Sequence, residues 1–260
     1  MTADVKQIAS RDNPLLVKLR KLVHDPAGYR KTGRAWIEGE HLCDAYVRRG
    51  GKPSQAVIAA AAWMRPAQRR LAEQAGQVAV VADELMAGFS TLESAAPIGF
   101  LVDVPAAGAL DPAAPSVVLD RLQDAGNVGT ILRSAAAFGF AQVVALKGTA
   151  ALWSPKVLRA GMGAHFALNL IEGAQADALA DLAVPLLATS SHAADELHRA
   201  ALPWPCAWVF GHEGQGVATD LLARCATTLR IAQPGGEESL NVAAAAAVCL
   251  YESARRRLST

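Results

Sequence analysis

Two glycine-rich stretches near the carboxyl end of the chain indicate its fold: Ala207-Trp-Val-Phe-Gly-His-Glu-Gly-Gln-Gly216 and Leu229-Arg-Ile-Ala-Gln-Pro-Gly-Gly-Glu-Glu-Ser-Leu-Asn-Val242. Each begins as a short apolar run of strand type and turns to glycine where the strand should end. The second then opens a long alanine-rich helix, with Ser239 at the expected N-cap position. In open α/β sheets, ligands bind at the carboxyl ends of the strands. Two such ends, each carrying a carboxylate or an amide, predict a small-molecule site.

Strands and helices alternate over the second half of the chain. Short apolar strands are expected at residues 117–120, 142–146, 166–171, 185–189, 208–210 and 228–231. Helices are expected between most of them, at residues 128–138, 155–162, 176–182 and 219–225. Buried strands that alternate with helices form a parallel sheet that is covered on both faces. The predicted fold class is therefore α/β with a parallel sheet.

A smaller α/β domain is expected before a proline-rich break. The stretch Val104-Pro-Ala-Ala-Gly-Ala-Leu-Asp-Pro-Ala-Ala-Pro-Ser116 has three prolines and no apolar periodicity, which is typical of a linker. We therefore expect a first domain over residues 1–105, a linker at 106–115 and a second domain at 116–260. In the first domain, helices are expected at 14–23, 39–49 and 68–74, and strands at 35–38, 56–59, 78–81 and 97–103.

Charge is distributed unevenly between these domains. Residues 1–70 contain 14 Lys and Arg against 6 Asp and Glu, a net of +8, whereas residues 111–260 contain 11 against 13, a net of −2. A basic segment joined to a near-neutral remainder fits a polyanion-binding module attached to an enzyme. A solvated helical face would give the same composition, so charge alone leaves both interpretations open.

Several classes of protein are excluded by composition. The chain is 52% hydrophobic and 19% charged, as expected of a globular protein rather than a disordered one. It has no apolar stretch near the roughly 18 residues of a membrane span, and residues 1–8 lack the apolar core of a secretion signal. We therefore predict a cytoplasmic protein without a membrane partner. Cysteines and histidines lack metal-ligand spacing, so we predict reduced thiols and no metal site: Cys43, Cys206, Cys225 and Cys249 form no CxxC.

A third loop, Leu119-Asp-Arg-Leu-Gln-Asp-Ala-Gly-Asn-Val-Gly-Thr-Ile-Leu-Arg-Ser134, follows the first strand of the second domain and runs into a helix. It lacks the third glycine of a dinucleotide fingerprint, and no acid pairs with it at the next strand end, which argues against a nicotinamide-dependent oxidoreductase. Asn127 at the helix cap and Arg133 within the helix could both project toward a ligand. Alternatively, Asn127 only caps the helix and Arg133 pairs with a surface acid.

Taken together, the three loops resemble the motifs of the SpoU/TrmH family. The matching residues, in the family's order and spacing, are Asn127-x-Gly-x-x-x-Arg133, Phe210-Gly-His-Glu-Gly-x-Gly216, and Ile231 through Ser239-Leu-Asn-Val242. The resemblance covers residues 116–258 and includes Ala136-Ala-Phe-Gly139 and Ser154-Pro-Lys-Val-Leu-Arg-Ala-Gly-Met-Gly163. Members of this family are S-adenosylmethionine (AdoMet)-dependent RNA ribose methyltransferases of the SPOUT superfamily. The amino-terminal region, from Ile8-Ala-Ser-Arg-Asp-Asn-Pro14 to Glu38-Gly-Glu-His41, is similar to the substrate-binding domain that is often fused to this catalytic domain.

The resemblance implies a trefoil-knotted second domain, a homodimer with the active site near the subunit interface, AdoMet as cofactor and ribosomal or transfer RNA as substrate. Carried over by motif position, main-chain contacts to the cofactor fall at Gly211, Ile231 and Leu240, with Thr189 as a further candidate. At Gly211, a side chain would block close approach of the backbone to the cofactor. Many relatives have Pro-Met after the isoleucine, whereas this chain has Ala232-Gln233, a change that main-chain contacts to the cofactor should survive.

The resemblance also implies five catalytic residues: Asn127, Arg133, Glu213, Ser239 and Asn241. The family's usual assignment makes Arg133 the group that activates the ribose 2′-hydroxyl. Because a guanidinium is very hard to deprotonate, we favour a role in which Arg133 grips the adjacent phosphate and stabilises a developing alkoxide.

The other four residues have supporting roles in this interpretation. Asn127 and Asn241 orient the ribose or Arg133, and Ser239 caps its helix and contacts phosphate at the helix N-terminus. Glu213 holds Arg133 or a loop amide, and a purely loop-bracing role for it is equally open. An inactive dimeric RNA-binding scaffold is the alternative function, against which the presence of all five residues argues.

Overall fold

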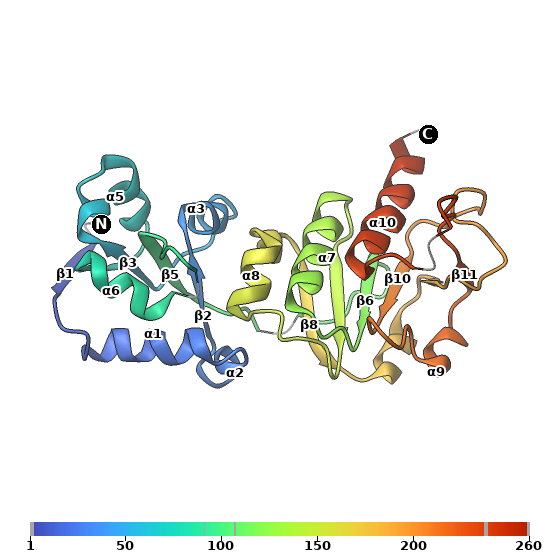
Figure 1. Cartoon of the computed structure of the whole chain (residues 1–260), viewed down its shortest axis with the longest axis horizontal. Coiled ribbons are helices and arrows are strands. Elements are labelled where there is room, and N and C mark those ends of the chain that lie inside the picture. The colour runs from blue at the N-terminus through green and yellow to red at the C-terminus, as the bar shows by residue number, and fades with distance from the viewer. Residues whose placement is uncertain (1–2, 91, 107, 237–238, 259–260) are drawn as a thin grey trace. The chain divides into compact units, whose positions relative to one another are not determined.

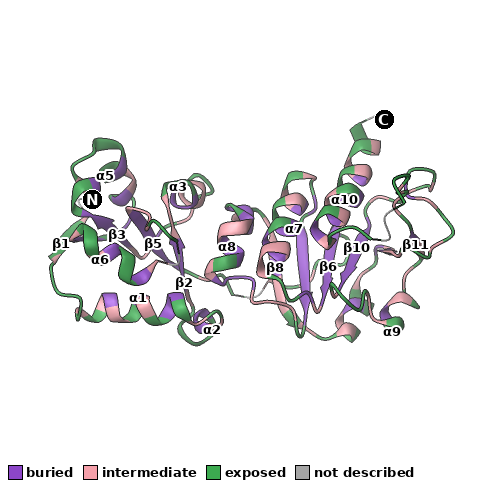
Figure 2. Cartoon of the chain, viewed as in Figure 1, coloured by how far each residue is buried: buried purple, intermediate pink, exposed green. Residues whose placement is uncertain are grey.

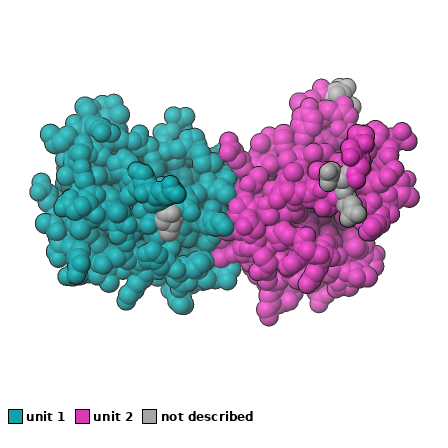
Figure 3. Space-filling view, in the orientation of Figure 1, with its two compact units in different colours: residues 1–106, 153–166 teal, residues 107–152, 167–260 magenta. Residues whose placement is uncertain are grey.

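The computed structural model describes residues 3–90, 92–106, 108–236 and 239–258. The chain divides into two compact units, which Figure 3 shows in different colours. The first unit contains residues 1–106 and 153–166, and the second contains residues 107–152 and 167–260. Residues 153–166, which the sequence placed in the second domain, group with the first unit, where Phe166 contacts Tyr46 edge-to-face with ring centroids 5.0 Å apart.

The proline-rich segment is held against the second unit. Asp111 donates its N–H to the Gln142 side chain at 3.1 Å and accepts from the same side chain at 2.8 Å. Asn169 donates to the Ala109 carbonyl at 2.8 Å, and Ala183 donates to the Pro112 carbonyl at 2.9 Å. The stretch expected to be a linker therefore has specific contacts with the sheet that follows it.

A five-stranded mixed sheet forms the first unit. Its strands, in the order β1-β4-β3-β5-β2, are β1 (Asp4–Ile8), β2 (Arg34–Glu38), β3 (Gln55–Ala59), β4 (Gln77–Val81) and β5 (Ile98–Asp103). Strand β5 runs antiparallel to β2 and β3, and the other pairs are parallel. Helices α1 (Pro14–His24) and α2 (Gly28–Thr32) lie on one face, and α3 (Glu40–Arg48) and α5 (Pro66–Ala72) on the other (Figure 1). The shorter helices are α4 (Ala60–Trp63), α6 (Asp83–Met86) and the 3-10 helix η1 (Ala87–Phe89).

Six parallel strands form the sheet of the second unit, which confirms the predicted fold class. In the order β11-β9-β10-β6-β7-β8, they are β6 (Ser116–Asp120), β7 (Gln142–Leu146), β8 (Asn169–Ala174), β9 (Leu186–Thr189), β10 (Ala207–Gly211) and β11 (Thr227–Leu229). The helices that come after β5 in the chain are α7 (Ala125–Ala137), α8 (Pro155–Gly161), α9 (Thr219–Leu222) and α10 (Val242–Leu258), with the 3-10 helices η2 (Ala164–Ala167) and η3 (Ala176–Asp181).

Two predicted elements differ from the structure. The strand expected at 166–171 begins only at Asn169, because the start of the apolar run belongs to η2. The helix expected at 176–182 is the 3-10 helix η3, whose Leu179 is buried against the sheet.

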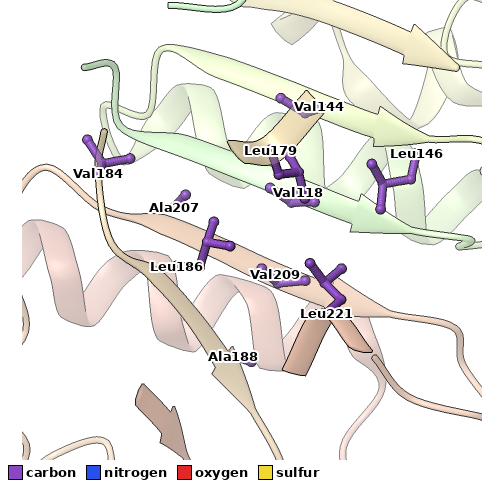
Figure 4. Packing of buried hydrophobic residues seen from close by; sticks show 10 residues of the cluster. All are labelled: Val118, Val144, Leu146, Leu179, Val184, Leu186, Ala188, Ala207, Val209 and Leu221. Carbon is purple, nitrogen blue, oxygen red and sulfur yellow. The ribbon is translucent and has the colours of Figure 1, made fainter. Parts of the chain in front are cut away.

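Alternating side chains cover the two faces of this parallel sheet. On one face, Val118, Val144, Leu186 and Val209 pack with Leu179 of η3 and Leu221 of α9 (Figure 4). On the other face, the Trp208 indole donates to Ser253 of α10 at 2.9 Å, and α10 packs beside α7. Both faces are therefore buried, as Figure 2 shows by the purple strands.

Parallel strands also bring their carboxyl ends to one edge of the sheet. Strands β6, β10, β9 and β11 are consecutive neighbours, and they end at Asp120, Gly211, Thr189 and Leu229. The loops that follow them, which include the three predicted from the sequence, therefore gather at this edge. Within the described ranges, no helix is long and apolar enough to cross a membrane.

Candidate active site

A cavity of about 630 Å³ lies among the loops that follow β9, β10 and β11. Its lining includes seven residues predicted from the sequence: Thr189, Gly211, Glu213, Ile231, Ser239, Leu240 and Asn241. The volume falls within the roughly 300–1,000 Å³ that is common for small-molecule sites. The predicted cofactor residues thus share one cavity.

The chemistry of the lining suits a ligand that is held largely by the main chain. Phe210, Val217 and Leu222 supply apolar surface. Among the described residues, the main-chain N–H and C=O groups of Ile231 and Leu240 have no hydrogen-bond partner. Because backbone polar groups need partners when a ligand covers them, these groups are available to the polar atoms of a bound molecule.

Gly211 is required by the path of its own loop. A Cβ atom at this position would lie 2.1 Å from the Gly216 carbonyl carbon and 2.1 Å from the Val217 nitrogen. The loop after β10 folds back on its own start, where Gly216 donates to the His212 carbonyl at 2.7 Å. The absence of a side chain at Gly211 therefore permits the loop to close, and the contact of its main chain with the cofactor stays a prediction.

Glu213, on this loop, braces the loop that precedes α7. Its carboxylate accepts from the Gln123 N–H at 3.2 Å, the Asp124 N–H at 3.1 Å and the Asn127 side chain at 3.3 Å. Burial acts to raise the pKa of Glu213, but hydrogen bonds from main-chain N–H groups and from Asn127 outweigh it and hold the pKa below its usual value. The geometry favours the loop-bracing role over a contact with Arg133.

Asn127 and Asn241 join the same hydrogen-bonded cluster. The Asn241 side-chain amide donates to the Asn127 side-chain oxygen at 3.0 Å, while the Asn127 amide donates to Glu213. Asn127, Glu213 and Asn241 come from three separate segments, and we call them the amide–carboxylate cluster. Their contacts link the loops after β6, β10 and β11.

Two predicted helix caps are wrong. Helix α7 is capped by Asp124, whose side chain accepts from the Asn127 N–H at 2.8 Å, so Asn127 lies in the first turn and is free to bond Glu213. Helix α10 is capped by Asn241, which accepts from the Ala243 N–H at 2.9 Å and the Ala244 N–H at 3.3 Å. Ser239 lies too early in the chain to cap α10, although it lines the cavity. The neighbouring Glu237 and Glu238 lie outside the described residues.

Arg133 stands apart from this cluster. It is exposed on α7, does not line the cavity, and makes no hydrogen bond or ion pair with any residue that the structure describes. The surface ion pair that the sequence left open for Arg133 is therefore absent from the described part of the chain.

Sequence reasoning missed an anchor at the end of β6. The buried Asp120 carboxylate pairs with the Arg121 guanidinium at 2.8 and 3.0 Å and accepts from the Ala218 N–H at 2.8 Å. Arg121 adopts a left-handed backbone (φ 58°) and donates to the Gln215 side chain at 3.2 Å. Burial acts to raise the pKa of Asp120, but Arg121 and the Ala218 N–H hold it below its usual value. Asp120 and Arg121 thus fix the loop that carries Glu213.

His212 has a local role. Its Nδ1 atom accepts from the Gly214 N–H at 3.0 Å, which braces the turn of the loop. In the part of the chain that the structure describes, no group of three or more His, Cys, Asp or Glu residues could hold a metal ion. The four cysteines are free thiols.

Comparison with known proteins identifies the family. The profile of the SpoU rRNA Methylase family matches residues 114–251, which contain every loop described above. The chain is 32% identical over 269 residues to an uncharacterized tRNA/rRNA methyltransferase of Synechocystis sp., covering 99% of this chain and 96% of the relative. It is 28% identical to the Bacillus subtilis 23S rRNA (guanosine(2553)-2′-O)-methyltransferase RlmP, covering 95% and 98% of the two chains.

A solved structure gives the same result. The AdoMet-bound rRNA methyltransferase from Sinorhizobium meliloti superimposes with a TM-score of 0.86 at 25% identity, covering 98% of each chain. The chain therefore belongs to the SpoU rRNA methylase family, and the resemblance inferred from its motifs is confirmed.

Proposed function

We propose that the chain is an AdoMet-dependent RNA 2′-O-ribose methyltransferase. One observation carries the proposal: the cavity and the amide–carboxylate cluster lie at the same edge of the sheet. The chain also belongs to the SpoU family. The names of its relatives support the activity, since RlmP is a 2′-O-methyltransferase of 23S rRNA and the Sinorhizobium structure holds AdoMet.

The cavity fits AdoMet because it offers apolar surface together with unpaired main-chain groups at Ile231 and Leu240. These two residues, the main chain of Gly211 and, at the end of β9, Thr189 would hold the cofactor. When bound, AdoMet supplies an electrophilic methyl group on a sulfonium. The chain's own contribution is to hold the acceptor ribose in line with that group, since positioning provides much of the rate of such transfers.

Arg133 is the residue of this chain that we assign to the acceptor. An exposed guanidinium without a partner among the described residues can form two hydrogen bonds to a phosphate and stabilise the charge that develops on the 2′-oxygen. Asn127 and Asn241 keep the loops at a fixed spacing, and Ser239 offers a hydroxyl at the cavity rim. Glu213 is already occupied by three donors, so we assign it to loop positioning rather than to proton removal.

We also propose that the chain acts as a homodimer. Val248 and Tyr251 of α10 are 41% and 51% exposed, and Tyr251 contacts Phe138, the C-cap of α7, with ring centroids 5.6 Å apart. Exposed apolar side chains on α10 support an interface between copies. Sedimentation at several concentrations tests the assembly, and a monomer at micromolar concentration would contradict it.

The remaining expectations follow from the same proposal. We infer that residues 1–105 bind the RNA substrate, that residues 116–260 hold the cofactor, and that the protein works in the cytoplasm. The excess of +8 among residues 1–70 supports the first assignment. The trefoil-knotted path of the second domain stays a prediction.

The proposal is tested by incubating the full chain with tritiated AdoMet and total RNA, followed by mapping of 2′-O-methylated nucleotides. We expect label in ribosomal or transfer RNA at ribose and not at base. RNA binding without transfer, by a chain that also fails to bind S-adenosylhomocysteine, would favour the inactive scaffold.

A further inference from the structure

Helices α4 and α5 of the first unit carry an aromatic and basic surface that the proposed active site does not use. We call it the Trp63 patch, and it consists of Trp63, Met64, Arg65, Arg69 and Arg70. Met64 is 80% exposed, more than any other large apolar side chain of the described residues except Leu258. A single exposed apolar side chain is common on protein surfaces, so the neighbours of Met64 decide what this surface can bind.

A fixed stack lies at the centre of the patch. The guanidinium carbon of Arg69 sits 4.6 Å from the centroid of the Trp63 ring, and the Nε atom of Arg69 bonds Glu73 at 2.8 Å. Arg69 is therefore held both by the ring and by a carboxylate one turn further along α5. The result is a preformed pair of planar groups at the surface, with little side-chain freedom left to lose on binding.

Two free cations flank this stack. The side chains of Arg65 and Arg70 are exposed, and neither makes an ion pair or a side-chain hydrogen bond with a described residue. Arg65 directly precedes Pro66, the first residue of α5, and Arg70 lies within that helix. Cations beside a planar stack are what a nucleic-acid strand needs, because its phosphates pair with arginine while its bases stack on aromatic and guanidinium planes.

Charge alone does not single out this surface. Helix α1 on the opposite face also presents two exposed lysines, Lys18 and Lys21, without a side-chain partner among the described residues. Its sequence, Pro14-Leu-Leu-Val-Lys-Leu-Arg-Lys-Leu-Val-His24, contains no Trp, Tyr or Phe. The aromatic stack distinguishes the Trp63 patch from a merely basic face, and it favours bases that are not already paired in a duplex.

We propose that the Trp63 patch binds unpaired nucleotides of the substrate RNA. The proposal rests on the RNA methyltransferase function stated above and adds where, and in what form, the RNA is held. A loop or bulge would place a base against the stack of Trp63 and Arg69, and Arg65 and Arg70 would contact the adjoining phosphates.

The test uses the full chain and two fluorescein-labelled RNAs: a hairpin with a long unpaired loop, and the same strand annealed to its full complement. We expect Trp63→Ala to weaken hairpin binding by roughly 5- to 100-fold and duplex binding little, because stacking serves unpaired bases. Trp63→Phe should restore most of the hairpin affinity. Arg65→Ala with Arg70→Ala should lower the slope of log affinity against log salt by about 1.4, since roughly 0.7 is lost per single-strand phosphate contact.

Lys18→Ala with Lys21→Ala is the matched control, and it should leave the preference for the hairpin unchanged. The arginine and lysine pairs are exposed, so these variants remain informative if Trp63→Ala lowers the melting temperature. Wild-type hairpin affinity for Trp63→Ala, or an equal loss for the arginine and lysine pairs, would overturn the proposal. If those variants are silent while the wild-type chain transfers methyl groups, only the patch assignment falls. A wild-type chain that binds neither RNA contradicts both the patch and the proposed function.

Discussion

The first turn of α7 and the turn that carries Arg133 belong to one helix, yet their side chains are held in opposite ways. In the first turn, Asp124 caps the helix and Asn127 bonds both Glu213 and Asn241. Arg133, six residues further along, is exposed and lacks a partner among the described residues. Hydrogen bonds within the chain thus assemble the loops, whereas the cation that we assign to the substrate is left free. Substitutions in the two regions should therefore fail in different ways.

The largest effect is expected at Arg133. Arg133→Ala should reduce methyl transfer roughly 100- to 1,000-fold, the usual cost of removing a group that stabilises developing charge. Melting temperature and affinity for S-adenosylhomocysteine should stay unchanged, because Arg133 contacts neither the cluster nor the cavity. Single-turnover transfer to total RNA and calorimetry measure the two quantities. Arg133→Lys should also transfer methyl groups slowly, since an ammonium lacks the planar fork of a guanidinium. Wild-type turnover by that variant would contradict the role assigned to Arg133.

Gly211→Ala comes next and should damage stability and cofactor affinity together. The added Cβ would lie 2.1 Å from the backbone of Gly216 and Val217, so the loop must move, at a cost of about 1–3 kcal/mol in unfolding free energy. Gly214→Ala is the matched control on the same loop, because its Cβ would meet only the His212 ring at 3.8 Å. Thermal unfolding and calorimetric titration with S-adenosylhomocysteine check both. Normal titration by a folded Gly211→Ala protein would show that loop closure and cofactor binding are independent.

A smaller loss of stability is expected for Glu213→Gln, which changes the contacts at the first turn of α7. The carboxamide replaces one acceptor oxygen by a donor that faces the N–H group of either Gln123 or Asp124, which should cost roughly 1–2 kcal/mol of unfolding free energy. Asp177→Asn, at an exposed acid without a partner among the described residues, is the control.

The effect of Glu213→Gln should depend on pH with a definite sign. Because the pKa of Glu213 is lowered in the folded chain, its stabilisation is present above the unfolded value of about 4.3 and is lost as pH falls through the folded pKa. Denaturant unfolding of wild type and variant from neutral to acidic pH should therefore converge at the acidic end. A difference that grows as pH falls would contradict the assignment.

The smallest effect is expected at Asn241, where cap and cluster can be separated. Asn241→Ala removes the α10 cap and should cost about 1 kcal/mol of unfolding free energy. Asn241→Asp keeps an oxygen that can cap the helix but loses the amide that donates to Asn127. We expect the aspartate variant to unfold like wild type and yet transfer methyl groups more slowly. Equal transfer rates for Asn241→Asp and wild type would indicate that Asn241 acts only as a cap.

Much of the fold could be predicted because a buried strand is recognisable from a short stretch of sequence. The apolar runs that became β6, β7 and β10 are short, continuous and bounded by turn residues. The prediction of β8 was shifted because its apolar run continues without a break into the preceding turn of η2. No local pattern indicates that residues 153–166 group with the first unit, since that depends on contacts such as Tyr46 with Phe166.

The site shows the same limit. Parallel strands share an edge, so the sequence could indicate which loops meet. It could not indicate which atoms bond, because the Glu213 carboxylate reaches Asp124 across 89 positions and Asp120 reaches Ala218 across 98. The caps were misassigned for a related reason: Asp124 and Asn241, rather than Asn127 and Ser239, stand directly before the helices. The role of the buried Asp120 carboxylate was overlooked because an aspartate at a strand end is common, and only its partners show that it anchors a loop.

The bond between Asn127 and Asn241 joins residues 114 positions apart, and this separation has a consequence for the order of folding. All six strands of the second unit are complete at Leu229, so the sheet of a growing chain can form before the residues beyond 239 leave the ribosome. The amide–carboxylate cluster cannot close until that final segment arrives, because Asn241 is one of its three members. A nascent chain therefore has all six strands before it has its site, and RNA that it meets in that interval encounters a protein whose loops are not yet joined.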